Sequence, residues 1–559
     1  MTRFPFSIIV TIIAIAIFMS FFRLGSVSFF DVDEAVFAEA TKEMFQSGNW
    51  ITPTYNGENR YDKPIFFYWL MAASYKLFGI NEFAARFPSA MASLLLALSV
   101  FFFVRYFLDS KNALYATISL VLSVYFLVYS HAAVTDITLT LFITLSICSF
   151  YLSVTGIPYS SLRKGGSWYI YGFYIFSALA FLTKGLIGIL FPFGIAIIYL
   201  LVTEGLTGIK KAFSLKGAIL FLIVAAPWYI AQIAINGQEF IQHLFIKHHF
   251  KRYTGVISGH KNPIYYFIPM LIIGLFPWIA FLPAGIRNLF LEVQSLRLRP
   301  EGFGELSRTA QPEGFKVQSK TNSLLKAQNS KVLLLAFIWL AFIFVFFSFS
   351  TTKLPNYILP AIPAASILIS SGMSIKERRS PYLVFGFLFI VIISFILGLL
   401  FVISKKYLSK IGIHDVNWTF ALATVMFAMA IASLYALLIK KTLYEYMSAL
   451  MIVFLVIISI KALPAANQYL QGTLYKYSLY AKERLHNGEI ITYGINNPSI
   501  VFYSGHKIIN VRNRDGLLPF IKNNRNLIAI SKTKDIDVLK DLGFNLLEND
   551  GRYAILEKK

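Results

Sequence analysis

The sequence has very little cysteine and little charge. A single cysteine, Cys148, occurs among 559 residues and lies in an apolar run, which excludes an intrachain disulfide framework and a cysteine-based metal site. Only 14% of the residues are charged, and the 28 acidic residues are outnumbered by 51 Lys and Arg. The chain also has no Walker or Rossmann glycine motif, so we expect no nucleotide-binding fold.

Apolar and aromatic residues make up most of the chain. The sequence is 57% hydrophobic and contains 54 Phe and 31 Tyr. Apolar runs long enough to cross a bilayer recur along most of its length, which is typical of a polytopic α-helical membrane protein and not of a soluble globule. We expect thirteen crossings, at 5–22, 86–107, 113–130, 133–155, 168–183, 186–203, 216–235, 264–286, 332–349, 357–373, 382–403, 416–439 and 444–463.

The distribution of Lys and Arg indicates how the chain crosses the membrane. A net charge of +23 would suit a nucleic-acid binder, but much of the basic excess lies in short loops between apolar runs. A cytoplasmic N-terminus places nearly every basic loop inside, as the positive-inside rule requires. We therefore expect no nucleic-acid partner, an uncleaved signal anchor at 5–22, and an outward-facing first loop.

Two domains are expected, a membrane domain at 1–463 and a smaller domain at 464–559. In the smaller domain EIITYGI, NLIAIS and YAILE are typical of short strands separated by weakly helical pieces, which predicts an α/β domain outside the cytoplasm. It lacks a Gly-rich phosphate loop, so we expect it to brace the outer loops or contact the acceptor. The polar cytoplasmic loop 291–330 is interpreted as a flexible segment.

The first outer loop, 23–85, is unusually acidic for this chain. Its stretch AVFAEATKEMFQSG predicts an amphipathic helix that ends at Gly48 and lies along the membrane surface. Carboxylates beside a membrane are tolerated when water, a metal or a substrate pairs with them, so this cluster indicates a functional site.

Four clusters on the outer side could form one site. They are DVDE (31–34) with YDKP (61–64), HAAVTD (131–136), KHHFKRY (247–253) with HKNPIYY (260–266), and TTKLPNY (351–357). Carboxylates with imidazoles suit a divalent ion, and Lys, Arg and Tyr suit a phosphate. Sugar transfer from a lipid phosphate uses all of these groups: a carboxylate deprotonates the acceptor, and cations or a metal stabilise the departing phosphate.

Each cluster also has a purely structural interpretation. Asp33 and Glu34 would be favoured by the dipole of the helix that follows them. Asp62 and Lys63 could form a surface ion pair of little energetic value. His248 and His249 would then be ordinary interfacial residues, and Lys353 would reach the headgroups as a membrane anchor.

The order of motifs resembles the bacterial polyprenyl-phosphate sugar transferases of the GT-C fold, the membrane group that includes protein mannosyltransferases. The likeness is strongest to the transferase that places 4-amino-4-deoxy-L-arabinose on lipid A. The similar stretches are DEAVFAEATKEMFQSGNWITP, NRYDKPIFFYW, AVTDITLT, LTKGLIGILFP, HHFKRY with HKNPIYYFIP and GLFPW, and FSTTKLPNYILPAIPA, which cover residues 30–365.

The resemblance implies a role for each matching position. Asp33, in the Asp-Glu pair with Glu34, would be the catalytic base. A divalent metal (zinc, magnesium or manganese) would be bound by carboxylates and an imidazole, and the lipid phosphate by cations and a tyrosine. The implied metal positions are Asp62, Asp136 and His249, and the implied donor-binding positions are Lys63, Arg252, His260, Lys353 and Tyr357.

The sequence departs from the aminoarabinose transferases at three positions. Val36 stands where they carry arginine, Phe37 where they carry tyrosine, and Asp62 where they carry glutamate. The resemblance implies an inverting, membrane-embedded enzyme of the bacterial inner membrane with its site on the periplasmic side. Its donor would be undecaprenyl-phosphate-linked aminoarabinose or a related sugar, and its acceptor lipid A.

Three alternatives remain at this stage. The first is a transferase that moves another sugar onto protein or surface polysaccharide. The second is a lipid or sugar transporter, for which the sequence shows no convincing internal repeat and no acids in mid-span. The third is an envelope scaffold that acts through the C-terminal domain and has no need of the acids and lysines above.

Overall fold

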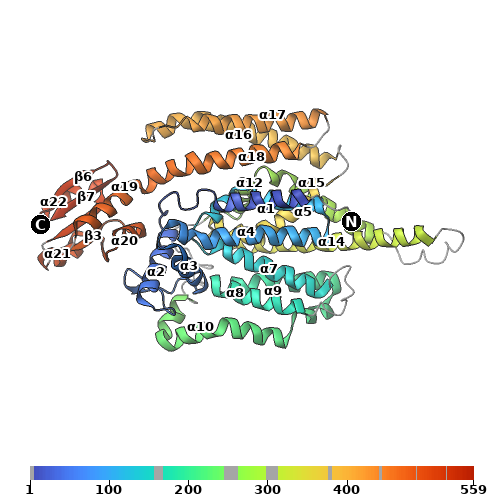
Figure 1. The fold of residues 1–559 in the computed structure, drawn as a ribbon, viewed down its shortest axis with the longest axis horizontal. Helices are drawn as coiled ribbons and strands as arrows, with labels where there is room; N and C mark the ends of the chain where they lie inside the picture. Colours follow the sequence, from blue (N-terminus) through green and yellow to red (C-terminus); the bar gives the residue numbers. More distant parts are fainter. Residues whose placement is uncertain are drawn as a thin grey trace.

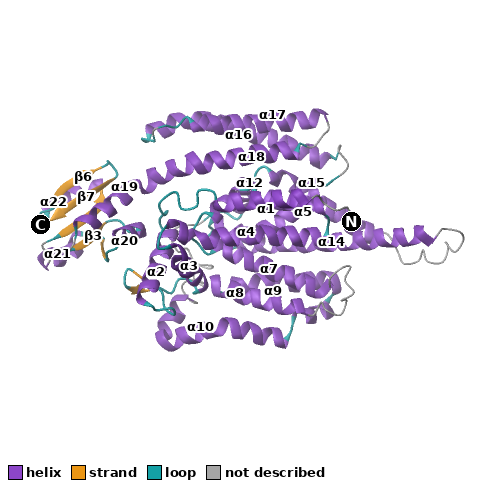
Figure 2. Ribbon diagram, viewed as in Figure 1, coloured by secondary structure: helices purple, strands orange, loops and turns teal. Residues whose placement is uncertain are grey.

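The protein consists of a bundle of long apolar helices with a small α/β domain at one end (Figure 1). The bundle is helical almost throughout, and all but two of the described strands lie in the C-terminal domain (Figure 2). The computed structural model describes residues 6–155, 168–244, 262–297, 313–375, 380–413, 415–439, 443–485, 488–523 and 526–558.

The helices of the membrane domain follow the predicted apolar runs. In chain order they are α1 (Phe6–Phe21), α4 (Glu82–Phe107), α5 (Ser110–Val121), α6 (Val124–Ser130), α7 (Asp136–Thr155), α8 (Tyr169–Lys184), α9 (Ile187–Glu204), α10 (Leu215–Ile241), α12 (Phe267–Leu275), α13 (Leu282–Arg297), α14 (Glu313–Ser348), α15 (Ile362–Met373), α16 (Pro381–Lys410), α17 (Trp418–Ile439) and α18 (Tyr444–Ile457). Short 3-10 segments connect some of them, namely η2 (Leu206–Ala212), η4 (Trp278–Phe281) and η6 (Pro355–Ala361).

The described chain crosses a membrane many times. Nine of its helical segments are long and apolar enough to span a bilayer, or eleven if each of two bent pairs forms one span. The bent pairs are α5 with α6, and α12 with the segment that begins at η4. The two remaining predicted crossings coincide with α1 and α8, which are apolar but only 16 residues long. A multi-pass architecture is therefore confirmed, whereas the count of thirteen full-length spans is not.

The spans differ in how deeply they are buried. The spans formed by α7 and by η6 with α15 are mostly enclosed by protein, whereas α10 and α16 expose most of their apolar side chains. Small residues permit the closest approach: a Cβ on Gly285 of α13 would lie 1.9 Å from the Leu368 carbonyl oxygen of α15. The bundle thus has an interior of tightly packed helices and an apolar exterior that suits lipid.

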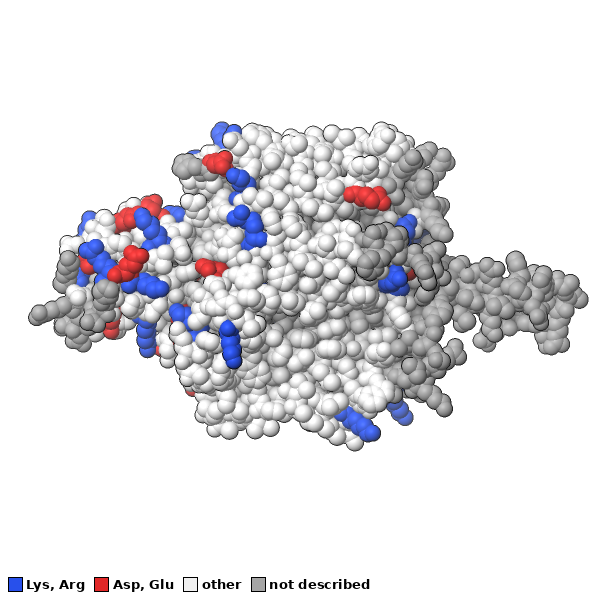
Figure 3. Space-filling model, in the orientation of Figure 1, with Lys and Arg blue, Asp and Glu red and all other residues white. Residues whose placement is uncertain are grey.

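On the face shown in Figure 3, the charged side chains of the described residues gather toward the two ends of the bundle. Lys, Arg, Asp and Glu gather over the C-terminal domain and the adjoining end of the bundle, and the broad middle of the bundle is almost uncharged. The two ends of the chain lie at opposite ends of the bundle (Figure 1). An odd number of crossings and an uncharged membrane belt both fit this arrangement.

The first loop is a folded layer beside the end of the bundle that faces the C-terminal domain. It contains α2 (Asp33–Ser47), the short hairpin of β1 (Thr54–Tyr55) and β2 (Glu58–Asn59), and α3 (Phe66–Phe78). The predicted helix end is confirmed, because Gly48 has a φ of 70° and its N–H donates to the Met44 carbonyl. Every residue from 34 to 41 is buried, so α2 is enclosed by protein on most sides.

The C-terminal domain is a five-stranded sheet with strand order β4-β3-β5-β7-β6. Strands β3, β4 and β5 are parallel, and β7 pairs antiparallel with both β5 and β6. The predicted strands correspond to β3, β5 and β7, and β4 and β6 were not foreseen. The elements are α19 (Leu463–Arg484), β3 (Glu489–Tyr493), α20 (Pro498–Ser504), β4 (Ile508–Val511), α21 (Arg514–Asn523), β5 (Leu527–Lys532), α22 (Ile536–Asp541), β6 (Asn545–Asn549) and β7 (Tyr553–Lys558).

One continuous helix joins the two domains. The last span, α18, passes through a π-helical turn at Ile458–Ala462 into α19, and the helical segment runs from Tyr444 to Arg484. The second half of α19 packs on the sheet, where Leu474, Tyr477 and Ala481 belong to its apolar core. The expected boundary after residue 463 therefore falls inside a helix.

The loop 291–330 is shorter than the sequence suggested. Helix α13 continues to Arg297 and α14 begins at Glu313, so helix occupies both ends of this stretch. The residues between them, 298–312, lie outside the described part of the chain.

A candidate active site beneath the first loop

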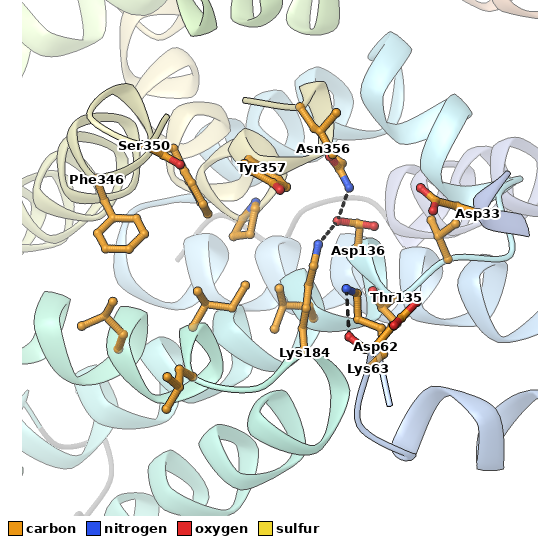
Figure 4. A pocket seen from close by; sticks show the side chains of 18 of the residues that line it. Asp33, Asp62, Lys63, Thr135, Asp136, Lys184, Phe346, Ser350, Asn356 and Tyr357 are labelled. Carbon is orange, nitrogen blue, oxygen red and sulfur yellow. Dashed lines mark hydrogen bonds and ion pairs between the residues drawn. The ribbon is translucent and has the colours of Figure 1, made fainter. Parts of the chain in front are cut away.

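A cavity of about 450 Å³ opens where the first loop meets the ends of α7, α8 and α14. One part of its wall is polar, with Asp33, Asp62, Lys63, Asp136 and Lys184 (Figure 4). Another part is apolar and is formed by Leu139, Leu186, Ile187, Leu190, Phe346 and Phe347. Three of the four predicted clusters thus contribute to one cavity.

The three acids of the DVDE segment lie in three different environments. The Asp31 carboxylate binds the C-terminal domain, where it accepts hydrogen bonds from Asn497 and Ser499. Asp33 is exposed and lines the cavity. Glu34, the second residue of α2, is buried and faces Arg86 of α4. Only Asp33 is placed to meet a substrate.

Glu34 belongs to a closed ionic network. Its two oxygens accept from Nε and Nη2 of Arg86, both at 2.9 Å, and also from the Ala133 and Phe30 amides at 2.7 and 3.0 Å. Such complete pairing is what a buried charge requires. Glu34 does not line the cavity, so the structure gives this predicted catalytic residue a structural position that holds the loop to α4.

Asp33 is the first residue of α2, and its carboxylate accepts no hydrogen bond within the described part of the chain. The preceding residue, Val32, provides no side-chain cap, so the helix start depends on its neighbours. A solvated carboxylate that faces a cavity can accept a proton from a bound hydroxyl. The predicted role of Asp33 as a base is compatible with this position.

Asp62 and Lys63 follow the hairpin and line the same wall. Asp62 forms a 3.1 Å ion pair with Nη1 of Arg60, and the Arg60 Nε donates to the Tyr68 hydroxyl at 3.0 Å. The Arg60 guanidinium also lies 5.6 Å from the centre of the Phe37 ring. Sequence reasoning assigned no role to Arg60, although it is the cation nearest in sequence to the Asp-Lys pair.

Asp136 and Lys184 form a charged pair at the cavity that is more buried than the pair of Arg60 and Asp62. Lys184, the last residue of α8, lies 2.5 Å from Oδ1 of Asp136 at the start of α7, and Asn356 donates to the same oxygen at 2.9 Å (Figure 4). The Lys184 ammonium also lies 5.7 Å from the centre of the Tyr357 ring. The buried Asp136 carboxylate thus has a cation and an amide as partners. Lys184 itself was missed, though a lone lysine that ends an apolar run was a signal.

Lys353 is not part of the cavity wall. Its Nζ donates to the carbonyls of Ser350 and Asn262 at 2.6 and 3.0 Å, and its side chain is buried. Burial lowers the pKa of Lys353 from its usual value. These contacts hold the loop that brings Asn356 and Tyr357 to the cavity, and the phosphate contact of Lys353 stays a prediction.

Sequence comparisons connect the chain to known sugar transferases. The profile of the dolichyl-phosphate-mannose-protein mannosyltransferase family matches residues 62–230. A protein of Edwardsiella ictaluri (strain 93-146) named undecaprenyl phosphate-alpha-4-amino-4-deoxy-L-arabinose arabinosyl transferase is 30% identical over 60% of this chain and 54% of its own length. A protein of the same name from Shewanella sediminis (strain HAW-EB3) is 29% identical over 65% of this chain and 59% of its own length. The matched part of the chain thus spans a little over half the length of these curated relatives.

A solved structure extends the likeness to nearly the whole chain. The crystal structure of ArnT from Cupriavidus metallidurans bound to undecaprenyl phosphate matches with a TM-score of 0.76 at 21% identity, over 99% of this chain and 98% of that chain. The chain has the GT-C fold. The GT-C resemblance inferred from the motifs is confirmed, and so is the GT-C architecture of a polytopic helical membrane protein.

The described residues do not include a complete set of metal ligands at the cavity. No group of three His, Cys, Asp or Glu that could hold an ion occurs in the described part of the chain. Asp62 faces Arg60 and Asp136 faces Lys184, so each candidate carboxylate already has a cation. The predicted ligand His249 lies outside the described ranges, as do Arg252 and His260, so the divalent metal stays a prediction.

Proposed function

We propose that this chain is an inverting glycosyltransferase that moves a sugar from polyprenyl phosphate, in bacteria undecaprenyl phosphate, to an acceptor outside the cytoplasm. The donor sugar is aminoarabinose, as the names of the relatives suggest. The acceptor is lipid A, as the resemblance of the motifs implies. One observation carries the proposal: a single cavity joins charged groups to an apolar wall. A lipid phosphate has the same division into a charged head and an apolar tail.

The acid content of the cavity supports an amino sugar. Asp33 lines it and forms no ion pair with a described residue, whereas Asp62 and Asp136 already face Arg60 and Lys184. At neutral pH a 4-amino sugar carries a positive charge. Carboxylates around a cationic ligand favour its binding and disfavour a neutral hexose. This complementarity supports aminoarabinose as the donor sugar.

The proposed reaction is one displacement. Asp33 takes a proton from the nucleophilic oxygen of the acceptor, which attacks the anomeric carbon from the face opposite the phosphate. The bond from the anomeric carbon to the phosphate oxygen breaks, and its electron pair leaves with the polyprenyl phosphate. A single displacement of this kind inverts the anomeric centre. General-base catalysis contributes roughly 10²- to 10⁴-fold to such a step.

The lysines of the cavity stabilise the leaving group. Lys63 and Lys184 present ammonium groups to the space in which Asp33 lies, and cations in a site shielded from water stabilise developing phosphate charge. Asp136 and Asn356 hold Lys184 in place, as their contacts at 2.5 and 2.9 Å suggest. The predicted divalent metal depends on His249, and no step of this reaction requires it.

The apolar wall gives the lipid tail a place to lie. Leu186, Ile187 and Leu190 begin α9 next to Lys184, and Phe346 and Phe347 end α14 on the facing side. An isoprenoid tail placed against them would leave its phosphate beside the lysines. We place this cavity on the periplasmic side of the inner membrane, because the cytoplasmic loops carry the basic excess.

A second candidate is the transfer of a different sugar, or transfer to protein or surface polysaccharide. Val36, which stands in place of the arginine of the aminoarabinose transferases, is buried in α2 and brings no charge to the cavity. The Arg60 guanidinium approaches Phe37 from the following segment, but it is engaged by Asp62 and Tyr68. A missing contact to the acceptor would favour this candidate.

Mass spectrometry of lipid A tests the proposal. Cells that carry the wild-type chain are compared with cells that carry Asp33→Asn, and Glu58→Gln, an exposed residue of the same loop, serves as control. We expect a phosphate-linked aminoarabinose increment with wild type and control, and none with Asp33→Asn. Unmodified lipid A in all three strains would refute lipid A as acceptor. A sugar then found on protein or polysaccharide would support the second candidate.

A further inference from the structure

The C-terminal domain forms hydrogen bonds with the loop that carries Asp33. Asp31, two residues before Asp33, accepts hydrogen bonds from the Asn497 side chain at 2.9 Å, from the Ser499 backbone N–H at 2.8 Å and from the Ser499 hydroxyl at 2.7 Å. Charge-assisted hydrogen bonds of this kind are stronger than neutral ones and fix the carboxylate in space. The contact joins residues more than 460 positions apart in sequence.

The same domain holds the residues just before Asp31. The Phe29 N–H donates to the Tyr503 hydroxyl at 2.8 Å, and Tyr503 in turn donates to Glu82 at 2.9 Å. The Phe29 ring is buried and meets the Phe502 ring edge-on at 4.9 Å between centroids. The segment that leads into the DVDE acids is therefore packed against α20 by both polar and aromatic contacts.

Asp33 lies between two anchors. On one side Asp31 is fixed by the C-terminal domain, and on the other Glu34 is fixed by Arg86 and the Ala133 amide. Asp33 itself has an exposed side chain and accepts no hydrogen bond among the described residues. Because α2 begins without a side-chain cap at Val32, its first turn has little local reason to hold one position.

We propose that Asn497 and Ser499 are positioning residues that hold Asp33 at the cavity through Asp31. This inference rests on the proposed function, since it takes Asp33 as the base of the transfer reaction. It gives the C-terminal domain a direct part in turnover, beyond bracing the membrane domain. The expected consequence is a loss of kcat with little change in donor KM, because the base moves while the lipid-binding wall stays in place.

The contact between Asn56 and Ile508 provides a matched control. Asn56 donates to the Ile508 carbonyl and accepts from its N–H, both at 2.8 Å, and so ties the hairpin to strand β4. It joins the same two domains but does not touch Asp31 or Asp33. Asn56 has a φ of 55°, so Asn56→Gly removes the two hydrogen bonds and keeps the backbone conformation.

The test compares full-length variants in detergent micelles. Asn497→Ala/Ser499→Ala removes the two side-chain hydrogen bonds that these residues donate to Asp31. Ser499→Thr keeps the hydroxyl, and Asn56→Gly is the control. Transfer is measured with undecaprenyl-phosphate aminoarabinose as donor and lipid A as acceptor, and amide hydrogen exchange is followed across residues 28–34. The exchange readout needs no sugar transfer.

We expect the double variant to lose about ten- to a hundredfold in kcat, in line with the cost of misplacing a catalytic group by an ångström. Its donor KM should stay within about twofold of wild type, its segment 28–34 should exchange faster, and Ser499→Thr and Asn56→Gly should behave like wild type. Unchanged kcat in the double variant would overturn the inference. An equal loss in Asn56→Gly would also overturn it, because any loosening of the domain would then suffice.

Failure of the proposed function gives a different result. In that case the wild-type chain itself transfers no aminoarabinose. Hydrogen exchange alone then decides whether the contact of Asn497 and Ser499 with Asp31 orders the loop. Faster exchange at 28–34 in the double variant and not in Asn56→Gly supports the positioning role. Equal exchange in both variants and the wild type overturns it.

Discussion

The Lys184 ammonium lies 2.5 Å from the Asp136 carboxylate, at the point where α8 ends and α7 begins. Both side chains are largely buried, with relative exposures of 12% for Lys184 and 6% for Asp136. Neither charge would be stable here without the other, so the pair joins the folding of the bundle to the electrostatics of the cavity.

Removing Lys184 should therefore destabilise the protein as well as inactivate it. Loss of one partner of a buried pair costs about 3–5 kcal/mol, since it leaves an uncompensated charge. We expect Lys184→Met to lower the unfolding temperature in detergent, and Lys184→Met/Asp136→Leu to recover most of that loss without recovering transfer. If the double variant regains activity, the pair has only a structural role.

Lys63 should contribute to donor binding. A hydrogen bond from an ammonium group to a phosphate contributes about 1.5–3 kcal/mol, so Lys63→Ala should weaken binding of undecaprenyl phosphate by roughly ten- to a hundredfold. Lys76→Ala, which changes an exposed lysine at the end of α3, is the control. Tryptophan fluorescence titration with undecaprenyl phosphate measures the affinity. Equal affinities for the two variants would remove Lys63 from the phosphate site.

Glu34 should be needed for stability and not for the chemical step. Glu34→Gln leaves Arg86 with an incomplete partner in a buried site, and we expect a loss of about 3 kcal/mol in stability. Any folded Glu34→Gln protein should keep transfer activity per molecule within about tenfold of wild type. Asp33→Asn should lose more, because of these two acids only Asp33 lines the cavity. Activity normalised to the folded fraction, measured by size-exclusion chromatography, checks this. A hundredfold loss per folded molecule would show that Glu34, the second anchor of Asp33, is needed for the chemical step.

The apolar wall should distinguish long lipid tails from short ones. Leu190 is 40% exposed at the start of α9 and lines the cavity. Leu190→Trp fills part of this space, so it should weaken binding of undecaprenyl phosphate about tenfold, which corresponds to about 1.4 kcal/mol. Geranyl phosphate, whose tail is too short to reach far along the wall, should bind as it does to wild type. An equal effect on both lipids would place the tail elsewhere.

Much of the fold could be predicted because apolar runs of about twenty residues leave few structural choices. Each predicted run overlaps a helix, and Gly48 ends α2 as its lack of a side chain suggested. The strands β4 and β6 were missed for a physical reason. Strand β4 has only four residues, too few to show a clear period, and every residue of β6 is exposed, so β6 lacks the apolar pattern of a buried strand.

The site was predicted less completely than the fold. Asp33, Asp62, Lys63, Asp136 and Tyr357 do meet at one cavity, because the motifs that carry them end at the same side of the bundle. Sequence position could not show which acid of DVDE faces the cavity, since that depends on partners far away in the chain, such as Arg86 and Ser499. It also could not separate Lys353, held by two carbonyls, from Lys184, which points at Asp136.

The continuous helix from Tyr444 to Arg484 fixes the position of the C-terminal domain relative to the last span, so the number of residues in this helix matters for the site. Each residue inserted in a helix rotates everything beyond it by about 100° and advances it by about 1.5 Å. A single insertion near residue 470 would thus turn the sheet and carry α20 around the helix axis, away from Asp31. The number of residues between the last span and Ser499 therefore determines whether Ser499 reaches Asp31, so an insertion or deletion there should disturb the site as a substitution in the cavity would.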